Sequence, residues 1–414
     1  MITKPSFRIS SAIAVILIPV TVAKSQDTEA PRPTGTSIRV IDESLLIRTG
    51  DPVRIEDSRV LIFDGPPGLP SIIPSEEFLA VVTTPNTSRS TFLSDRNSSA
   101  RSGDDAPITV PYLELVDGQR FPGTLRPSDK GEPVWRSAWL KDIRFDLDRI
   151  SRLNLSEDGR AVPDAVDADV VVLANGDRIE GLVADIGFNV EIEVDRPDGE
   201  TNSVMIPLDR IASISLVNPM EPGDGAMTWL RGGHRILSES IRILGDGYVS
   251  LMSPQVGGGT AEIPLDFLVA TVVDANRVLP LATQDVVSLD PGPAGEIRSW
   301  IPEPKSFPGH HAFDAAPIRM DGPLRVEFDL PSKGGRLATT LERPMEIGSG
   351  RLIFRVLDDG RPVHSVVVDE DDPIHPIVVD FESDRLGFEI DSGDDGPFHD
   401  SIVLREAIIV RPRD

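Results

Sequence analysis

Short apolar runs separated by tight-turn dipeptides recur along the chain, and three of them repeat at a regular interval. Leu115, Leu173 and Leu230 each precede such a dipeptide, which reads Asp-Gly, Asn-Gly and Gly-Gly in turn. These pairs are favoured where both central residues of a hairpin turn need positive φ. The turns recur about 60 residues apart. Each repeat is therefore predicted to open with a β-hairpin.

Each repeat also contains a small residue after the turn and a similar closing line. The small residues, five positions beyond the turn glycine, are Gly123, Gly181 and Ser238. A small residue inside a strand usually marks a sharp bend, which helps to close a small barrel. The closing lines, each with an apolar-Asp pattern, occupy 145–150, 206–211 and 263–268. We expect three five-stranded, barrel-like repeats, at 110–157, 168–219 and 224–276.

A fourth, degenerate copy is expected at 37–84. Residues 73–82 resemble the closing line, but Thr49-Gly50 stands too close upstream to give the same spacing. The copy is therefore predicted to be truncated or divergent. The following segment, 85–109, is rich in Ser, Thr, Asn and Asp, a composition typical of a flexible linker.

The pattern changes in the last part of the chain, 290–414. Seven or eight strand-like runs follow one another there at a spacing of about ten residues, which predicts a β-sandwich. The expected fold class is therefore all-β, with tandem small five-stranded barrel-like repeats followed by a C-terminal jelly-roll-type β-sandwich.

The first 25 residues have the pattern of a secretory signal peptide. Lys4 and Arg8 precede an apolar stretch, and small residues flank Lys24 at a cleavage site. The stretch has about a dozen residues, whereas a membrane span needs about 20; a retained anchor is the alternative. The protein is expected to be exported, to the periplasm, the cell surface or the medium. With no cysteine, its domains must rely on their apolar cores.

The net charge of −26 weighs against two classes of partner. Nucleic acids and anionic membranes bind proteins mainly through Lys and Arg, so neither is expected to bind this chain. The repeats nevertheless resemble the Sm-like barrel, in 175–178 and 206–211, in the form that recurs in exported planctomycete proteins. The resemblance implies a fold only. The repeats lack the basic and aromatic groups that stack RNA bases.

The C-terminal part resembles the novel putative carbohydrate-binding module, NPCBM, of exported glycosidases and planctomycete surface proteins. The matching stretches are 335–341, 351–360, 378–390 and 391–408, with a looser match at 309–330. The resemblance implies a jelly-roll fold and carbohydrate binding. Where the family often has Trp, this chain has Ile402, Val403 or Leu404, and sugars usually stack on aromatic side chains.

Polar residues in the loops of these matching stretches are the candidate ligand-binding residues. They are His310, His311, Asp358, Asp359, Asp394, Asp395, His399 and Asp400. The alternative is that the histidines belong to an entry loop and that the acids only face solvent. Oxygen-rich loops suit structural Ca²⁺, but the two densest acidic runs, 369–372 and 391–395, lack the EF-hand spacing. No cofactor and no metal site are therefore expected.

Catalysis is not expected, because no nucleophile elbow, P-loop, dinucleotide fingerprint or zinc-protease motif occurs. The repeated Arg120, Arg178 and Arg235 are predicted to form ion pairs within each repeat, with Asp148, Asp209 and Asp266 as their partners. The predicted function is an exported, non-enzymatic binding protein that recognises a polysaccharide or glycan. The alternatives are a structural or scaffolding protein of the cell envelope with protein contacts only, and an accessory subunit of a glycoside-degrading complex.

Overall fold

The computed structural model describes residues 36–413, apart from internal gaps. The gaps are 46, 50–52, 57–58, 63–70, 75–77, 86–109, 128–132, 138–139, 141, 145, 157–164, 196–198, 222, 244–246, 254–258, 291–310, 345–349 and 393–399. The predicted signal peptide lies outside the described residues, and so does the predicted linker except for Pro85, which ends β6. The described elements are strands and single-turn 3₁₀ helices, and every strand pairing is antiparallel. The all-β prediction is confirmed.

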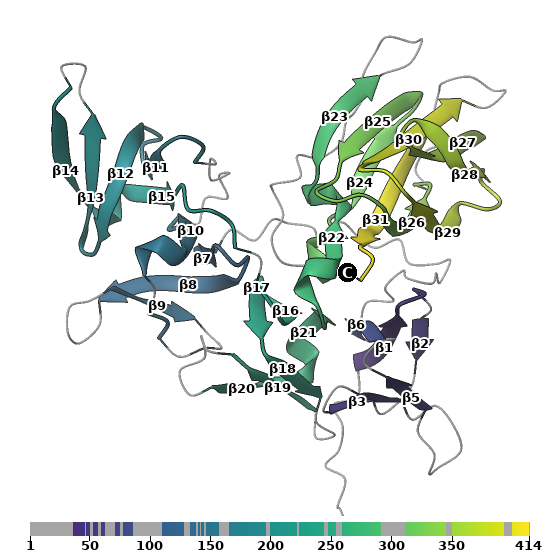
Figure 1. Cartoon of the computed structure of the whole chain (residues 1–414), viewed down its shortest axis with the longest axis horizontal. Coiled ribbons are helices and arrows are strands. Elements are labelled where there is room, and N and C mark those ends of the chain that lie inside the picture. The colour runs from purple at the N-terminus through teal and green to yellow at the C-terminus, as the bar shows by residue number, and fades with distance from the viewer. Residues whose placement is uncertain are drawn as a thin grey trace, which may run out of the picture.

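The described residues between 36 and 277 form four meanders and a short connecting segment that contains η5 (Ala275–Arg277) (Figure 1). The first meander comprises β1 (Thr36–Asp42), β2 (Ile47–Thr49), β3 (Val53–Glu56), β4 (Arg59–Ile62), β5 (Ser71–Pro74) and β6 (Phe78–Pro85). The second comprises β7 (Tyr112–Leu115), β8 (Arg120–Pro127), β9 (Pro133–Ser137), η2 (Leu147–Arg149) and β10 (Ile150–Asn154).

The third and fourth meanders have five and six strands, and like the second they place a 3₁₀ turn before the last strand. The third comprises β11 (Asp169–Leu173), β12 (Arg178–Ile186), β13 (Asn189–Asp195), β14 (Thr201–Pro207), η3 (Leu208–Arg210) and β15 (Ile211–Ser215). The fourth comprises β16 (Ala226–Leu230), β17 (His234–Ser238), β18 (Ser240–Ile243), β19 (Tyr248–Met252), β20 (Thr260–Pro264), η4 (Leu265–Phe267) and β21 (Leu268–Val272).

The meanders share sheets with one another instead of closing into separate barrels. One 15-stranded sheet runs through all four, because β10 pairs with β15, β8 with β17, and β21 with β6. A second, six-stranded sheet joins β18–β20 to β3–β5. The expectation of self-contained barrel-like repeats is corrected accordingly. Strand edges that would close each barrel pair with the neighbouring meander, which satisfies the same backbone groups.

The small residues predicted to mark bends lie where a strand changes partner. β8 pairs with β7 up to Pro122 and with β9 from Gly123 onward. A Cβ at Gly123 would lie 2.2 Å from the carbonyl oxygen of Arg136, so no larger residue fits this crossing. Gly181 has the same position in β12, where an added Cβ would lie 2.2 Å from the carbonyl oxygen of Glu193. The two glycines thus mark the points where a strand changes partner, although the meanders do not close into separate barrels.

The first meander is more complete than the sequence suggested. Its opening turn lies between β1 and β2 and has Leu45 at a φ of 63°, whereas Thr49 is the last residue of β2. Asp42 accepts a 3.0 Å hydrogen bond from the backbone N–H of Ser44 and stabilises this turn. The turn contains no glycine, which explains why the sequence concealed it.

The C-terminal part forms two five-stranded sheets around a common core. The elements that precede and open it are η5 (Ala275–Arg277), β22 (Val278–Pro280), η6 (Leu281–Thr283), β23 (Asp285–Asp290), η7 (Ala312–Asp314), β24 (Ile318–Asp321) and β25 (Leu324–Asp329). They continue with β26 (Gly335–Glu342), β27 (Leu352–Asp358), β28 (Arg361–Val368), β29 (Ile374–Phe381), β30 (Arg385–Ser392) and β31 (Ser401–Val410). One sheet has the order β22-β31-β26-β29 with β24 beside β31, and the other the order β23-β25-β30-β27-β28.

A separate apolar cluster joins the meanders to the C-terminal sheets. It combines Trp229 of β16 and Val272 of β21 with Phe313 of η7 and Val410 of β31. The rings of Trp229 and Phe313 meet edge to face, with centroids 5.6 Å apart. The C-terminal sheets are thus packed onto the first and fourth meanders (Figure 1).

The described residues lack two kinds of feature. No helix among them is long and apolar enough to cross a membrane. No group of three or more histidine or acidic side chains among them is arranged to hold a metal ion.

Candidate functional site

Two of the predicted ligand-binding residues, Asp358 and Asp359, lie at the β27–β28 turn. Asp359 has a φ of 46° there. The carboxylate of Asp358 accepts hydrogen bonds from the backbone N–H groups of Glu382 and Ser383, at 2.9 and 3.0 Å, and one from the Ser383 hydroxyl. Burial opposes ionisation, but these donors hold the pKa of Asp358 below its usual value. Its carboxylate therefore stabilises the neighbouring turn.

Asp400 lies far from that turn. It is buried next to Gly322, which also contacts Ile390. Because Asp358 pairs with Leu386, it lies four residues, or about 13 Å along β30, from Ile390, the residue beside Gly322 and Asp400. The structure does not bring them into one site.

The remaining predicted residues are not brought together with them. His311 immediately precedes η7, and its carbonyl oxygen accepts a 3.2 Å hydrogen bond from the N–H of Asp314. His310, Asp394, Asp395 and His399 lie outside the described residues. A role of these side chains in ligand binding stays a prediction.

A different hollow lies where β1 and β22 meet the end of β31. Its volume is about 430 Å³. We call it the junction pocket, and its lining residues are Glu43, Arg277, Gly335, Arg336, Asp380, Val410, Arg411, Pro412 and Arg413. They come from the first meander, the connecting segment and the C-terminal sheets, so the pocket exists only when these parts are assembled.

Glu43 is the central carboxylate of the junction pocket. Arg277 donates to both of its carboxylate oxygens, with Nη2 at 2.7 Å from Oε2. Arg413 donates to Oε1 from 2.9 Å. Arg277 also donates to the carbonyl oxygen of Arg411, at 3.0 Å. One acid of the first meander thus holds arginines from two other parts of the chain.

Arg336 and Asp380 form a second ion pair at the rim of the pocket. They are cross-strand neighbours on β26 and β29, and two N–H groups of Arg336 reach the two carboxylate oxygens at 2.6 and 3.2 Å. The hydrogen bond from Arg336 lowers the pKa of Asp380. The same contact raises the pKa of Arg336. Both groups are therefore charged over the whole physiological range.

The junction pocket has an excess of positive charge. Four arginines and two acids line it, whereas the whole chain carries a formal charge of −26. Planar guanidinium and carboxylate groups donate and accept pairs of hydrogen bonds in a fixed geometry. Val410, Pro412 and Gly335 supply an apolar part of the wall. This combination suits a polyhydroxylated or anionic ligand of small size.

Sequence reasoning missed these residues because they are scattered. Glu43, Arg277, Arg336 and Arg413 are separated by long stretches of chain and belong to no shared motif. One signal was available: the run from Val410 to Arg413 places two arginines directly after an apolar strand in a chain that is otherwise acidic.

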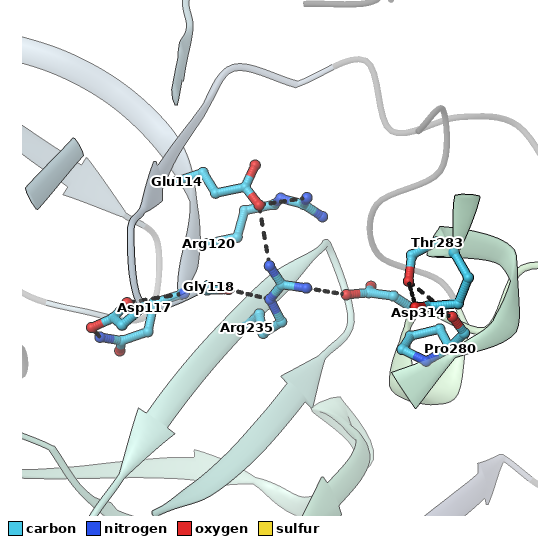
Figure 2. Close-up of polar contacts among 10 residues, drawn as sticks. Glu114, Asp117, Gly118, Arg120, Arg235, Pro280, Thr283 and Asp314 are labelled. Atoms are coloured by element: carbon cyan, nitrogen blue, oxygen red, sulfur yellow. Dashed lines mark hydrogen bonds and ion pairs between the residues drawn. The ribbon is translucent and has the colours of Figure 1, made fainter. Parts of the chain in front are cut away.

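A second charged cluster, which we call the arginine–glutamate cluster, joins the second meander to the fourth (Figure 2). The buried Glu114 accepts hydrogen bonds from Arg120 at 3.2 Å and from Arg235 at 3.1 Å. Arg235 also donates to the carbonyl oxygen of Gly118, and to Asp314 of η7 at 2.6 Å. The cluster therefore ties two meanders and the C-terminal part together.

The predicted ion pairs within the repeats are corrected by this arrangement. Arg120 and Arg235 meet Glu114 instead of Asp148 and Asp266, and Arg178 pairs with Glu180 at 2.9 Å in place of Asp209. Strand pairing between meanders brings Arg120 and Arg235 directly opposite each other, and an acid from a third strand then lies between them. A pattern within one repeat cannot reveal a contact between two repeats.

His234 lies buried beside this cluster. Its Nε2 is 2.6 Å from the hydroxyl oxygen of Ser137, and both side chains are buried. Burial lowers the pKa of His234 to about 4. The Nδ1 atom has no hydrogen-bond partner in the described part of the chain. A Ser–His pair without a third orienting group and without solvent access is not arranged for nucleophilic catalysis.

This burial predicts a pH-dependent stability. The unfolded chain binds a proton on His234 below pH 6.5, whereas the folded chain does so only near pH 4. Neutral His234 therefore makes its full contribution to the free energy of unfolding above pH 6.5, and this contribution is lost as pH falls to about 4. Relative to His234→Gln, the wild type should lose about 3 kcal/mol of unfolding free energy across this range.

Urea unfolding of the wild type and of His234→Gln at a series of pH values measures the difference between their free energies of unfolding. The difference is needed because burial raises the pKa of Glu406 to about 7, which changes stability in the opposite direction over the same range. Glu406 is present in both proteins, so its contribution to the pH dependence cancels in the difference. A difference that stays constant with pH would contradict the assignment of a neutral, buried His234.

Comparison with known proteins gives weak structural similarities. No protein-family model matches the chain, and no curated protein matches it. A Clostridium perfringens ZmpB fragment, described as CBM51-2 in complex with GlcNAc and INT domains, is 16% identical with a TM-score of 0.26. That match covers 42% of this chain and 37% of the other. The chain thus spans little more than a third of the length of the first structure that it matches.

Two further structures are similar to parts of the chain. The CBM51 of Clostridium perfringens GH95, in complex with methyl-galactose, is 14% identical with a TM-score of 0.24 and covers 32% of this chain and 99% of that one. Tandem CBM51 modules of a Streptococcus pneumoniae family 98 glycoside hydrolase are 12% identical with a TM-score of 0.24 and cover 59% of this chain and 88% of that one. At these TM-scores the similarity does not assign a fold or a ligand.

Proposed function

We propose that this chain is an exported, non-enzymatic binding protein that recognises carbohydrate through its C-terminal part. In this proposal the two five-stranded sheets are a β-sandwich of the NPCBM kind, and the four meanders are spacers that present it. The saccharide site is the junction pocket. The meanders also complete this site, because Glu43 comes from the first of them.

The observation that carries the proposal is the pairing of guanidinium and carboxylate groups around one open hollow. The pair of Arg336 and Asp380 lines it together with Glu43 and Arg413, and Arg336 also donates to the carbonyl oxygen of Glu43 at 3.3 Å. Such groups hydrogen-bond neighbouring hydroxyls of a sugar ring, while Val410 and Pro412 can contact its C–H face. A volume of about 430 Å³ accommodates one or two sugar units.

The charge of the pocket favours an acidic saccharide. The arginines outnumber the acids four to two. A uronate carboxylate or a sulfate group should therefore bind there with a more favourable free energy than a neutral sugar does. The acidic surface elsewhere repels polyanions. Binding should therefore be confined to the pocket, and it should tighten when salt screens the remaining surface.

Arg336→Ala tests this assignment in the full-length chain. Loss of one charge-assisted hydrogen-bonding group should weaken binding to a polyuronate or a sulfated polysaccharide about 10- to 100-fold. Affinity electrophoresis against these polymers and a neutral glucan gives the readout. Arg361→Ala is the matched control, because Arg361 is exposed on β28 and does not line the pocket. Equal retention of both variants on every retained polymer would show that the pocket is not the site.

A scaffolding protein with protein contacts only is the second candidate function. It is favoured by the aromatic side chains of the C-terminal sheets. All five phenylalanines described between 311 and 413 are buried, so the described part of these sheets presents no phenylalanine ring to a sugar. This candidate predicts that the wild-type chain is retained on none of the polymers. Retention that Arg336→Ala abolishes favours carbohydrate binding instead.

A further inference from the structure

The second and fourth meanders are joined at equivalent strand edges. β8 and β17 are the second strands of their opening hairpins, and they pair antiparallel with Arg120 opposite Arg235. These two arginines hold the same position in the repeat. The contact therefore relates two copies of one edge by an approximate twofold axis.

The equivalent edge of the third meander has no partner among the described strands. Arg178 through Gly181 pair with β11 on one side, and β13 pairs with β12 only from Leu182 onward. The residue before the repeated arginine shows the contrast. Gln119 and His234 are buried, whereas Asp177 is exposed. Arg178 and Glu180 have 48% and 59% of their side-chain surface exposed.

The backbone of this edge is arranged as in the joined hairpins. Leu115 donates to the carbonyl oxygen of Gln119 at 2.9 Å, and Leu173 donates to that of Asp177 at 2.8 Å. Backbone groups of successive residues in a strand point to opposite sides. In both hairpins the following arginine therefore directs its N–H and C=O away from the first strand. For Arg120 this is the direction of β17.

We propose that β12 pairs with β12 of a second copy of this chain, in a twofold-symmetric dimer with the two copies of Arg178 opposite each other. An unpaired strand edge is a template for such pairing, and a closed twofold contact uses the same patch on both subunits. The second and fourth meanders provide the internal example. The third meander lies at the far end of the molecule from the C-terminal sheets, so a second copy can approach it (Figure 1).

The charges of the edge are compatible with this pairing. Arg178 already contacts Glu180 at 2.9 Å, two residues along the same strand face. In an antiparallel pair centred on Arg178, each arginine is a diagonal neighbour of Glu180 from the other copy, within reach of a long side chain. The high negative charge of each chain opposes association at low salt. Dimerisation should therefore strengthen as the ionic strength rises.

Arg178→Pro tests the contact in the full-length chain by analytical ultracentrifugation. The substitution removes the outward N–H, which β11 does not use, and proline is tolerated on an edge strand. The wild type is expected to form a concentration-dependent dimer, and the variant to be monomeric with an unchanged thermal transition. Arg178→Ala keeps the N–H and should still dimerise. A monomeric wild type, an open polymer or a dimeric Arg178→Pro would each overturn the proposal.

Cross-linking provides an independent test if Arg178→Pro does not fold. The chain has no cysteine, so Arg178→Cys introduces a single thiol at the proposed twofold axis. Directly opposite residues of paired strands lie within disulfide range. Mild oxidation should yield a disulfide-linked dimer of Arg178→Cys at least 10-fold faster than one of Ser203→Cys, which places the thiol on the exposed strand β14. Equal rates would overturn the proposal.

Discussion

Replacement of Glu114 by alanine is expected to lower the free energy of unfolding by about 3–5 kcal/mol. Glu114 is buried between Arg120 and Arg235, and it compensates both charges at 3.2 and 3.1 Å (Figure 2). Without it, two guanidinium groups remain in a desolvated junction with a single acid, Asp314, on one of them. Urea denaturation followed by tryptophan fluorescence measures the loss, since Trp135 and Trp229 are both buried.

Glu180→Ala is the matched control for this prediction. Glu180 contacts Arg178, the repeated arginine that lies outside the buried cluster, and both side chains are exposed. Exposed ion pairs contribute little, so the control should change stability by less than about 0.5–1 kcal/mol. A loss for Glu114→Ala no larger than that of the control would mean that the buried cluster does not hold the second and fourth meanders together.

The same cluster predicts acid sensitivity. Burial opposes the ionisation of Glu114, but Arg120, Arg235 and Arg152 outweigh it and lower the pKa. A depressed carboxylate pKa stabilises the fold above the pKa of the unfolded chain, and this contribution is lost as pH falls through the folded value. The stability gap between the wild type and Glu114→Ala should therefore narrow as pH falls below about 4.5.

Trp229→Ala is expected to cost a similar amount, about 3–5 kcal/mol, because it opens a cavity in the cluster that joins the meanders to the C-terminal sheets. Trp229 packs edge to face on Phe313, which is fully buried. Thermal unfolding should show a lower transition temperature. The earlier exposure of the C-terminal sheets should appear as faster hydrogen exchange in β22 and β31, which pair beside this cluster.

Phe188→Ala is the matched control for the loss of an aromatic side chain. Phe188 is 68% exposed at the β12–β13 turn, so its removal should change stability by less than about 1 kcal/mol. Normal exchange in β22 and β31 of Trp229→Ala would contradict the account of the junction. The C-terminal sheets would then be held to the meanders by other contacts.

Local signals in the sequence predicted the strands and turns well. The contacts between repeats could not be predicted from them. The turn glycines Gly118, Gly176 and Gly233 all have positive φ, and Gly123 and Gly181 lie where strands change partner. These features depend on residues a few positions apart. The pairing of β8 with β17 depends on two edges that are more than a hundred residues apart in sequence, and no local pattern encodes it.

The candidate site was less predictable than the fold for the same reason. The family resemblance directed attention to polar loops, but Asp358 stabilises the neighbouring β29–β30 turn, and Asp400 precedes β31 of the other sheet. The junction pocket is assembled from Glu43, Arg277 and Arg336, which come from three parts of the chain. Only the packing of the C-terminal sheets on the first meander brings these charges together.

We propose that the junction pocket is the carbohydrate site of this chain. A crystal structure of the full-length protein with an oligosaccharide of the best-retained polymer tests it most directly. The account predicts the sugar in the pocket, with hydrogen bonds to Arg336 and Arg413 and contact with Pro412. A sugar bound elsewhere, such as at the β27–β28 turn beside Asp359, would contradict it.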